Sequence, residues 1–194
     1  LFPLYQRPNI ISILQYIKKK KQQGICHKVY IYTNNQGPKS WALLIKKYFE
    51  NKINYPLFDK VIHAYKVQGQ HIEKNRTTHN KTVADFLKCT KLSKKTTICF
   101  LDDQYHEQML NPNVYYLHLK PYSYNYNPDI LFQEFQKYFK LNNSYIEFLR
   151  QSDNTILLQY NLYLKQYSNN TNLSYETNVS KKIVSELQYY FKDF

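Results

Sequence analysis

Several residue types and patterns are scarce in this chain of 194 residues. It holds only three glycines and three cysteines, and no apolar run approaches the roughly 20 residues that a membrane-spanning helix needs. Cys26, Cys89 and Cys99 are odd in number and lack metal-ligand spacing, which favours reduced thiols over a disulfide framework. These absences predict an intracellular protein, cytoplasmic or nuclear, that has no membrane partner.

The charge of the chain is strongly positive and unevenly placed. The net charge is +13, and residues 1–140 carry 22 Lys and Arg against 9 Asp and Glu, whereas residues 141–194 hold five of each. Such a field attracts an anionic partner, for example a phosphoprotein, a nucleotide or a nucleic acid. The alternative is a lysine-rich surface that only contacts solvent. Lys, Asn, Tyr and Ile are all abundant, as the codon bias of an AT-rich genome would make them, so the lysines need not reflect a partner.

Short apolar runs alternate with segments of helical apolar spacing. Strands are predicted at Val29–Tyr32, Val61–Tyr65, Ile98–Leu101 and Val114–Leu119. Strands that alternate with helices favour a parallel sheet with helices on both faces. Pro128 is expected to open one helix. From residue 141 the charge bias ends, and two further helices are expected over residues 145–166 and 179–191, joined by a polar segment at residues 168–177. The sequence therefore predicts an α/β domain over residues 1–140 and a helical appendage over residues 141–194.

Two of the expected helices bear on function. After Pro38, the stripe that we expect to be buried comprises Trp41, Leu44, Ile45, Tyr48 and Phe49. Asn80 is expected to cap a later helix, which places Lys81 in its first turn, where a cation opposes the helix dipole. Residues 68–79, which precede this helix, are polar and without pattern and predict a surface loop.

Two adjacent carboxylates stand where one predicted strand ends. Asp102 and Asp103 directly follow residues 98–101. The carboxyl ends of strands form the rim of the ligand crevice in open α/β sheets. Neighbouring carboxylates favour a cation beside them, and Mg²⁺ takes one or two carboxylates together with phosphate oxygens and water. The pair predicts a magnesium site. The alternative is a solvated acidic turn that caps the next segment through Asp103.

Two further polar features occupy comparable places. Thr33 and Asn34 begin the loop after one strand, just ahead of a helix N-terminus that suits an anion, and Lys81 lies near another helix start. Together with the two aspartates they could bind one phosphoryl group. The hydroxyl and the loop amides would bond its oxygens, the lysine would neutralise its charge, and magnesium would orient it. The sequence thus favours a phosphate site.

This order of hydroxyl, lysine and paired acids resembles the haloacid-dehalogenase-like hydrolase superfamily. There an apolar strand ends in Thr or Ser, a Lys follows, and a later apolar strand ends in paired acids; Val29–Thr33, Lys81 and Ile98–Asp103 match in that order. Arg7-Pro8 leads into a helix that comes before the first of these strands. This local pattern resembles the one in phosphatases that act on the C-terminal domain of RNA polymerase. Phe100–His106 is similar to the form found in large DNA viruses and protists. The resemblance covers about residues 5–120.

The resemblance implies a Rossmann-like fold and phosphoryl transfer through an aspartyl-phosphate, with Mg²⁺ as the cofactor. It implies that Thr33, with Asn34 beside it, binds phosphate, that Lys81 stabilises the anion, and that Asp102, helped by Asp103, holds the metal. Arg76 is a candidate for contact with the substrate. That substrate would be a small phosphomonoester or a protein phosphorylated on serine or threonine.

The chain departs from the family's pattern at the catalytic aspartates. The family places its nucleophile and general acid on an Asp-x-Asp ahead of the position of Thr33, but the first aspartate here is Asp59. We therefore expect the chain as given to be inactive, either because that segment was lost upstream of Leu1 or because the protein is a degenerate relative. The leading hypothesis is a fragment of a magnesium-dependent phosphatase. The rival is a non-catalytic basic protein of the same fold that binds nucleic acid or an acidic protein.

Overall fold

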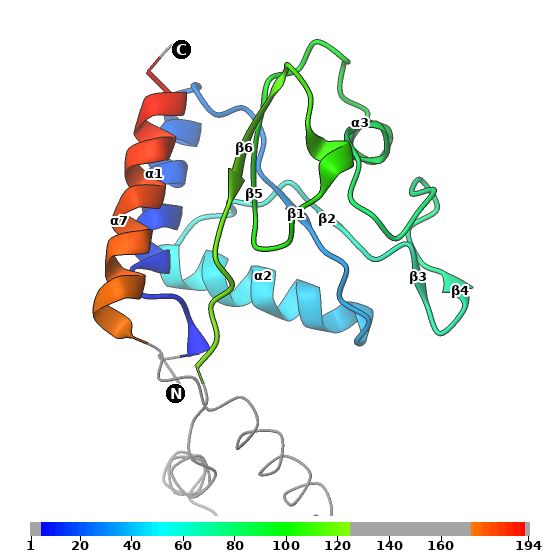
Figure 1. Cartoon of the computed structure of the whole chain (residues 1–194), viewed down its shortest axis with the longest axis horizontal. Helices are drawn as coiled ribbons and strands as arrows, with labels where there is room; N and C mark the ends of the chain where they lie inside the picture. Colours follow the sequence, from blue (N-terminus) through cyan, green and yellow to red (C-terminus); the bar gives the residue numbers. More distant parts are fainter. Residues whose placement is uncertain (1–4, 125–171, 193–194) are drawn as a thin grey trace, which may run out of the picture. The chain divides into compact units, whose positions relative to one another are not determined.

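A computed structural model of the chain describes residues 5–124 and 172–192 (Figure 1). The chain divides into two compact units, one made of Leu1–Pro8 and Tyr122–Val179 and the other of Asn9–Pro121 and Ser180–Phe194. The second unit contains all the described strands and the candidate site. The expected helix over residues 145–166 and the one opened by Pro128 lie outside the described residues. The predicted boundary at residue 140 stays a prediction.

Four helices and one 3-10 turn are described. They are α1 (Ile10–Gln22), α2 (Lys39–Ile53), α3 (Val83–Thr90), the 3-10 turn Glu107–Met109 and α7 (Leu173–Tyr190). The helix expected near the C-terminus is confirmed, although it begins earlier than the sequence indicated, within a segment predicted to be a polar connection. None of the helices in the described residues is long and apolar enough to cross a bilayer.

The strands form three two-stranded sheets. The parallel pairs are β1 (Tyr30–Tyr32) with β2 (Lys60–Ile62) and β5 (Ile98–Asp102) with β6 (Val114–His118), and β3 (Lys66–Val67) pairs antiparallel with β4 (Gln70–His71). All four predicted strands are therefore present, in a mixed α/β arrangement. Within the described part of the chain, no hydrogen-bonded ladder joins β1 and β2 to β5 and β6. A continuous Rossmann-like sheet stays a prediction.

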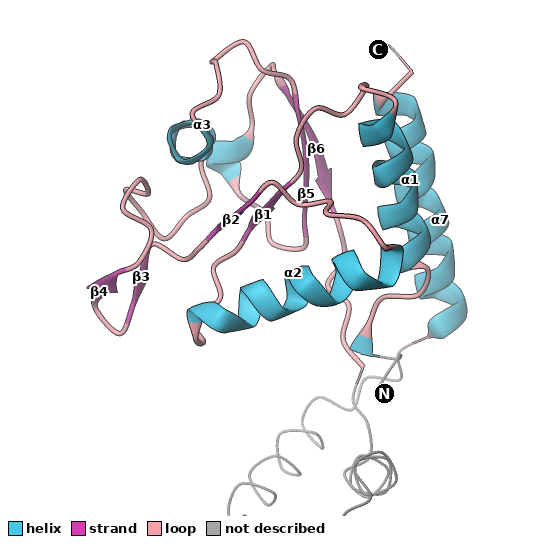
Figure 2. Cartoon of the chain, turned by 180° about the vertical axis from the view of Figure 1, so that it is seen from behind, coloured by secondary structure: helices cyan, strands magenta, loops and turns pink. Residues whose placement is uncertain are grey.

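One apolar core serves both parallel pairs. Ile62 of β2, Phe86 of α3 and Phe100 of β5 belong to the same buried cluster, against which Tyr30 and other strand residues pack. α3 therefore covers one face of the strands (Figure 2). On the opposite face of the β5–β6 pair, the Tyr115 hydroxyl donates a hydrogen bond to Glu186 of α7. The β5–β6 pair therefore contacts α3 on one face and α7 on the other.

A second buried cluster joins α1 to α2. Its buried members are Leu14 of α1, Ile53 at the end of α2, and Leu57 in the following loop, and Val29 packs against them. Val29 directly precedes β1. This cluster therefore places α1 and α2 together on the face of β1 that lies opposite α3.

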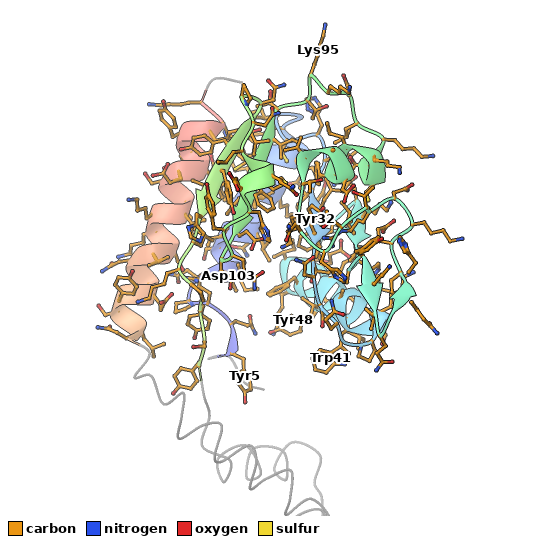
Figure 3. The ribbon with its side chains drawn as sticks, turned by 45° about the vertical axis from the view of Figure 1, so that its right-hand side comes forward. Tyr5, Tyr32, Trp41, Tyr48, Lys95 and Asp103 are labelled. Atoms are coloured by element: carbon orange, nitrogen blue, oxygen red, sulfur yellow. The ribbon has the colours of Figure 1, made fainter. Side chains whose placement is uncertain are left out.

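The expected buried stripe of α2 is wrong for Trp41, Leu44, Ile45 and Tyr48, which are exposed, and is confirmed for Phe49. Trp41, Leu44 and Ile45 are 59%, 62% and 48% exposed, and the helix instead buries Ala42 and Ile53 and packs Phe49 into the second cluster (Figure 3 labels Trp41). Residues 41–45 are almost all apolar, so two helix faces about 100° apart fit the same spacing. Periodicity alone could not choose between them.

Two leucines provide a test of this assignment. Leu57→Ala should lower the free energy of unfolding by about 2 to 5 kcal/mol, because Leu57 is fully buried and its truncation leaves a cavity. Leu44→Ala, the matched control, should change it by less than about 0.5 kcal/mol, because Leu44 is largely in solvent. Urea unfolding of both variants measures the difference. A larger loss at Leu44 would restore the stripe that the sequence predicted.

Candidate functional site

Lys81 lies just outside α3 rather than in its first turn. The N-cap is Thr82, whose hydroxyl oxygen accepts a hydrogen bond from the backbone N–H of Asp85 at 3.0 Å. The predicted cap, Asn80, is therefore wrong. Its carbonyl oxygen instead accepts a hydrogen bond from the guanidinium of Arg76. Because Lys81 precedes the cap, its side chain is free to turn toward the strands.

A buried ion pair joins Lys81 to Asp102 at the carboxyl end of β5. The Lys81 ammonium donates a hydrogen bond to Oδ2 of Asp102, and the two side chains are only 9% and 7% exposed. Oδ1 of Asp102 accepts a hydrogen bond from the backbone N–H of Gln104 at 2.9 Å. It also lies 3.5 Å from Nε2 of His106. Both carboxylate oxygens thus have partners within the protein.

The Lys81 ammonium also connects β5 to β1. Its Nζ lies 5.7 Å from the centre of the Tyr32 ring and 6.0 Å from that of the Phe100 ring, within reach of a cation–π attraction. The Tyr32 hydroxyl accepts a hydrogen bond from the backbone N–H of Thr82 at 3.4 Å. Burial raises the pKa of Tyr32 to about 12, so this hydroxyl keeps its proton at neutral pH. The carboxyl ends of β1 and β5 therefore meet at Lys81.

Arg76 braces the loop that carries Lys81. Its side chain is almost fully buried, and its NH1 and NH2 groups donate hydrogen bonds of 2.9 to 3.2 Å to the carbonyl oxygens of Thr33, His63, His79 and Asn80. The first two carbonyls directly follow β1 and β2. Arg76 thus ties the loop to the ends of both strands. Its contact with a substrate stays a prediction, and Nε, which is buried without a hydrogen-bond partner, is the one guanidinium nitrogen not used here.

The loop after β1 is folded by its own side chains. The Thr33 hydroxyl oxygen accepts a hydrogen bond from the backbone N–H of Asn35 at 3.1 Å, and Oδ1 of Asn35 accepts one from Gly37 at 2.8 Å. Such local bonds hold a turn in shape. Oδ1 of Asn34 is buried without a hydrogen-bond partner, which is uncommon for a polar atom in a protein interior. Oδ1 of Asn34, next to Thr33, is therefore an unsatisfied hydrogen-bond acceptor.

The structure brings together Thr33, Arg76, Lys81 and Asp102, which are far apart in the sequence. Asp103 follows at the same strand end, but its side chain is exposed (Figure 3). Sequence reasoning missed Tyr32 and His106 as members of the cluster. Their positions in the sequence could have indicated this. Tyr32 is the last residue of β1, and His106 lies four residues after Asp102 in the loop that follows β5.

The oxygen donors at this end of the strands suit a hard cation. Asp102 and Asp103 could contribute carboxylate oxygens, and Mg²⁺ commonly completes its shell with water and phosphate oxygens. Among the residues that the structure describes, no group of three or more His, Cys, Asp and Glu side chains is arranged to hold a metal. Two carboxylates alone would leave most positions around such a cation to water or to other ligands.

Comparisons of the chain with protein-family models, curated proteins and solved structures find no match. The structure itself defines the class: a mixed α/β unit with a buried lysine–aspartate pair at the carboxyl ends of two parallel strand pairs.

His106 makes the site's stability depend on pH. Burial lowers the pKa of His106 from its ordinary value of 6.5, an effect that Asp102 only partly offsets. The unfolded chain therefore binds a proton more readily, so stability present above pH 6.5 should be lost as the pH falls through the lowered pKa. His106→Gln should reduce this loss between pH 7.5 and 5, measured by urea unfolding.

His63, whose pKa burial also lowers, should retain part of that loss. The exposed His118→Gln is the matched control and should leave the wild-type pH profile unchanged. An unaltered profile in His106→Gln would contradict the assignment.

Proposed function

We propose that this α/β unit binds a phosphoryl group at the carboxyl ends of β1 and β5, as part of a magnesium-dependent phosphomonoesterase of the haloacid-dehalogenase-like kind. The observation that supports it most is the buried Lys81 ammonium, which lies within contact of both strand ends and pairs with Asp102. A lysine that is nearly out of water needs an anion. A phosphoryl dianion is a stronger partner for it than one carboxylate.

Each residue of the cluster has a part in the proposal. Thr33 donates its hydroxyl proton to a phosphoryl oxygen, with Asn34 beside it, while the Asn35 and Gly37 amides hold the loop in shape. Lys81 neutralises the charge that these oxygens carry. Asp102 and Asp103 would hold Mg²⁺, which supplies charge neutralisation and orients the phosphoryl group. Arg76 and Tyr32 fix the position of Lys81 relative to the loop after β1 through their hydrogen bonds.

Asp59 does not have the position that the family's nucleophile would need. Asp59, the first in the chain, accepts hydrogen bonds from Lys21, Lys28 and the backbone N–H of Val29. Val29 precedes β1, whereas Thr33 follows it, so Asp59 lies at the opposite end of the strand from the cluster. The ion pairs lower the pKa of Asp59, although burial opposes them. We therefore expect the chain as given to bind phosphate without hydrolysing esters.

Substrate choice in this proposal follows from charge. The exposed lysines and the net charge of +13 favour a large anionic substrate, such as a protein phosphorylated on serine or threonine. They favour it over a small phosphomonoester that carries no charge apart from its phosphate.

Binding of inorganic phosphate tests the proposal directly. Calorimetric titration in the presence of MgCl₂ should show binding that Lys81→Met weakens by about tenfold to a hundredfold, the usual worth of a hydrogen bond to a charged group. Lys88→Met is the matched control, because Lys88 is exposed on α3. Asp102→Asn should abolish the dependence on magnesium, whereas Glu107→Gln, an exposed acid in the same loop, should not.

Urea unfolding must show each variant folded under the titration conditions. Equal binding by wild type and a folded Lys81→Met would refute the proposed site. Magnesium dependence that persists in Asp102→Asn would refute the metal assignment alone.

The rival function, binding of nucleic acid, also has support. Lys88, Lys91, Lys94 and Lys95 are exposed at the end of α3 and in the loop that leads to β5, and Figure 3 shows Lys95 extending from that loop. If these lysines contact phosphates of a single-stranded oligonucleotide, changing all four to Gln should reduce the salt slope of binding by up to about 3. Fluorescence anisotropy across a salt series measures the slope. An unchanged slope would exclude this surface.

A further inference from the structure

A cavity of about 350 Å³ lies beside the amino ends of β5 and β6, whereas Lys81 and Asp102 meet at the carboxyl end of β5. Three segments line it: α3, the residues that lead into β5, and the turn that leads into β6. In Figure 3, Lys95, which precedes β5, lies at the other end of this strand from Asp103, which follows it. The cavity is therefore separate from the candidate phosphate site.

One part of the cavity lining is apolar. Val83, Ala84 and Leu87 contribute it from α3, where residues three and four positions apart are neighbours on the helix surface. The buried Ile98, the first residue of β5, continues it. Ala84 is exposed and has the shortest side chain among these four, which leaves room above the helix. An apolar wall of this kind suits the face of a ring system.

The amide side chains in the polar part of the lining have fixed orientations. Oδ1 of Asn111 accepts a hydrogen bond from the backbone N–H of Asn113 at 3.0 Å, and Nδ2 of Asn113 donates one to the carbonyl oxygen of Lys94 at 3.0 Å. Nδ2 of Asn111 is thus left as a donor and Oδ1 of Asn113 as an acceptor, and neither has a partner among the residues that the structure describes. Nucleobases present donors and acceptors of this kind along their edges.

The surroundings of the cavity carry charge of one sign. Residues 86–101 include four lysines and no acidic residue. These lysines, Lys88, Lys91, Lys94 and Lys95, are all exposed, and Lys94 also lines the cavity. A single phosphate group carries a charge of about −2, whereas a nucleic-acid strand carries one negative charge at every phosphate along its length. Four separate cations therefore fit a strand better than one free nucleotide.

We propose that this cavity takes one unpaired base of a single-stranded nucleic acid, with the neighbouring phosphates of that strand on the four lysines. A base within a duplex is paired and stacked, so it cannot enter a cavity of this kind without leaving the helix. The inference rests on the nucleic-acid binding that these lysines support as the rival function, and it adds a base subsite to that function. It does not depend on phosphate binding at Lys81.

Oligonucleotides with and without bases test the subsite. The probes are an eight-residue oligothymidylate and an abasic strand of the same length and charge, each carrying a fluorescent label. Anisotropy should show that the full chain binds the oligothymidylate about fivefold to a hundredfold more tightly, as expected for one well-held base. Thymidine monophosphate, added as a competitor, should bind at least about a hundredfold more weakly than the strand, because it contacts fewer lysines.

Two variants alter the cavity and leave the lysines in place. Ala84→Leu fills it from an exposed helix position, and leucine is a good helix former. It should abolish the preference for bases and leave the binding of the abasic strand unchanged. Ser40→Leu, the matched control on the exposed side of α2, should keep the preference. Asn111→Asp retains the oxygen that accepts from Asn113 but lacks the donor, and it should also reduce the preference.

Changing the four lysines to Gln should weaken binding of both strands alike. Equal binding of the two strands by the wild-type chain would overturn the base subsite, as would a full preference in Ala84→Leu and Asn111→Asp once urea unfolding has shown both to be folded. Thymidine monophosphate binding as tightly as the strand would overturn the assignment to a strand. If the two strands bind equally and both depend on the lysines, the rival function stands without the subsite, whereas no binding of either strand would refute both.

Discussion

The contact between Lys81 and Asp102 is the constraint on which the site depends. Removing two charges from water costs several kcal/mol each, and their attraction repays this only with good geometry and further hydrogen bonds. Here Gln104 supplies such a bond to Asp102, and the Tyr32 and Phe100 rings flank the ammonium. The pair therefore adds little net stability. What it does is to hold the ends of β1 and β5 at one place, although no ladder among the described strands joins the two.

Arg76 is also a buried charge that hydrogen bonds compensate, and its partners are backbone carbonyl oxygens. Four carbonyl oxygens from three separate segments converge on one planar guanidinium, a geometry that Lys could not satisfy. Without these bonds, the loop that carries Lys81 would have no fixed relation to the strand ends. A hairpin, β3–β4, precedes this loop, so the chain leaves the strands after β2 and returns to them at Arg76. The lysine is thus positioned by backbone contacts as much as by its own ion pair.

The sequence placed Lys81 and Asp102 near one another because carboxyl ends of parallel strands lie at one edge, and the structure has the two side chains in contact. Thr33 is tied to the same region through its carbonyl oxygen, which accepts a hydrogen bond from Arg76. The sequence did not predict Arg76 as a brace, since its partners are backbone carbonyls and carry no sequence signal. The buried face of α2 was mispredicted, except at Phe49, because Trp41, Leu44 and Ile45 fit the helical period as well as Ala42 and Ile53 do. Whether the two parallel pairs form one sheet is decided by long-range pairing, which the local spacing of apolar residues does not encode.

The occupied carboxylate has a physical consequence for metal binding. Lys81 uses Oδ2 of Asp102 as its anion, so that oxygen is not available to a divalent cation. If a phosphoryl group came within reach of the ammonium, Lys81 would have a second anionic partner. Asp102 could then turn a lone pair toward a cation without leaving a buried lysine unpaired. Binding of the phosphoryl group and preparation of the site for metal would in this way be one event, controlled by the charge balance around a single ammonium.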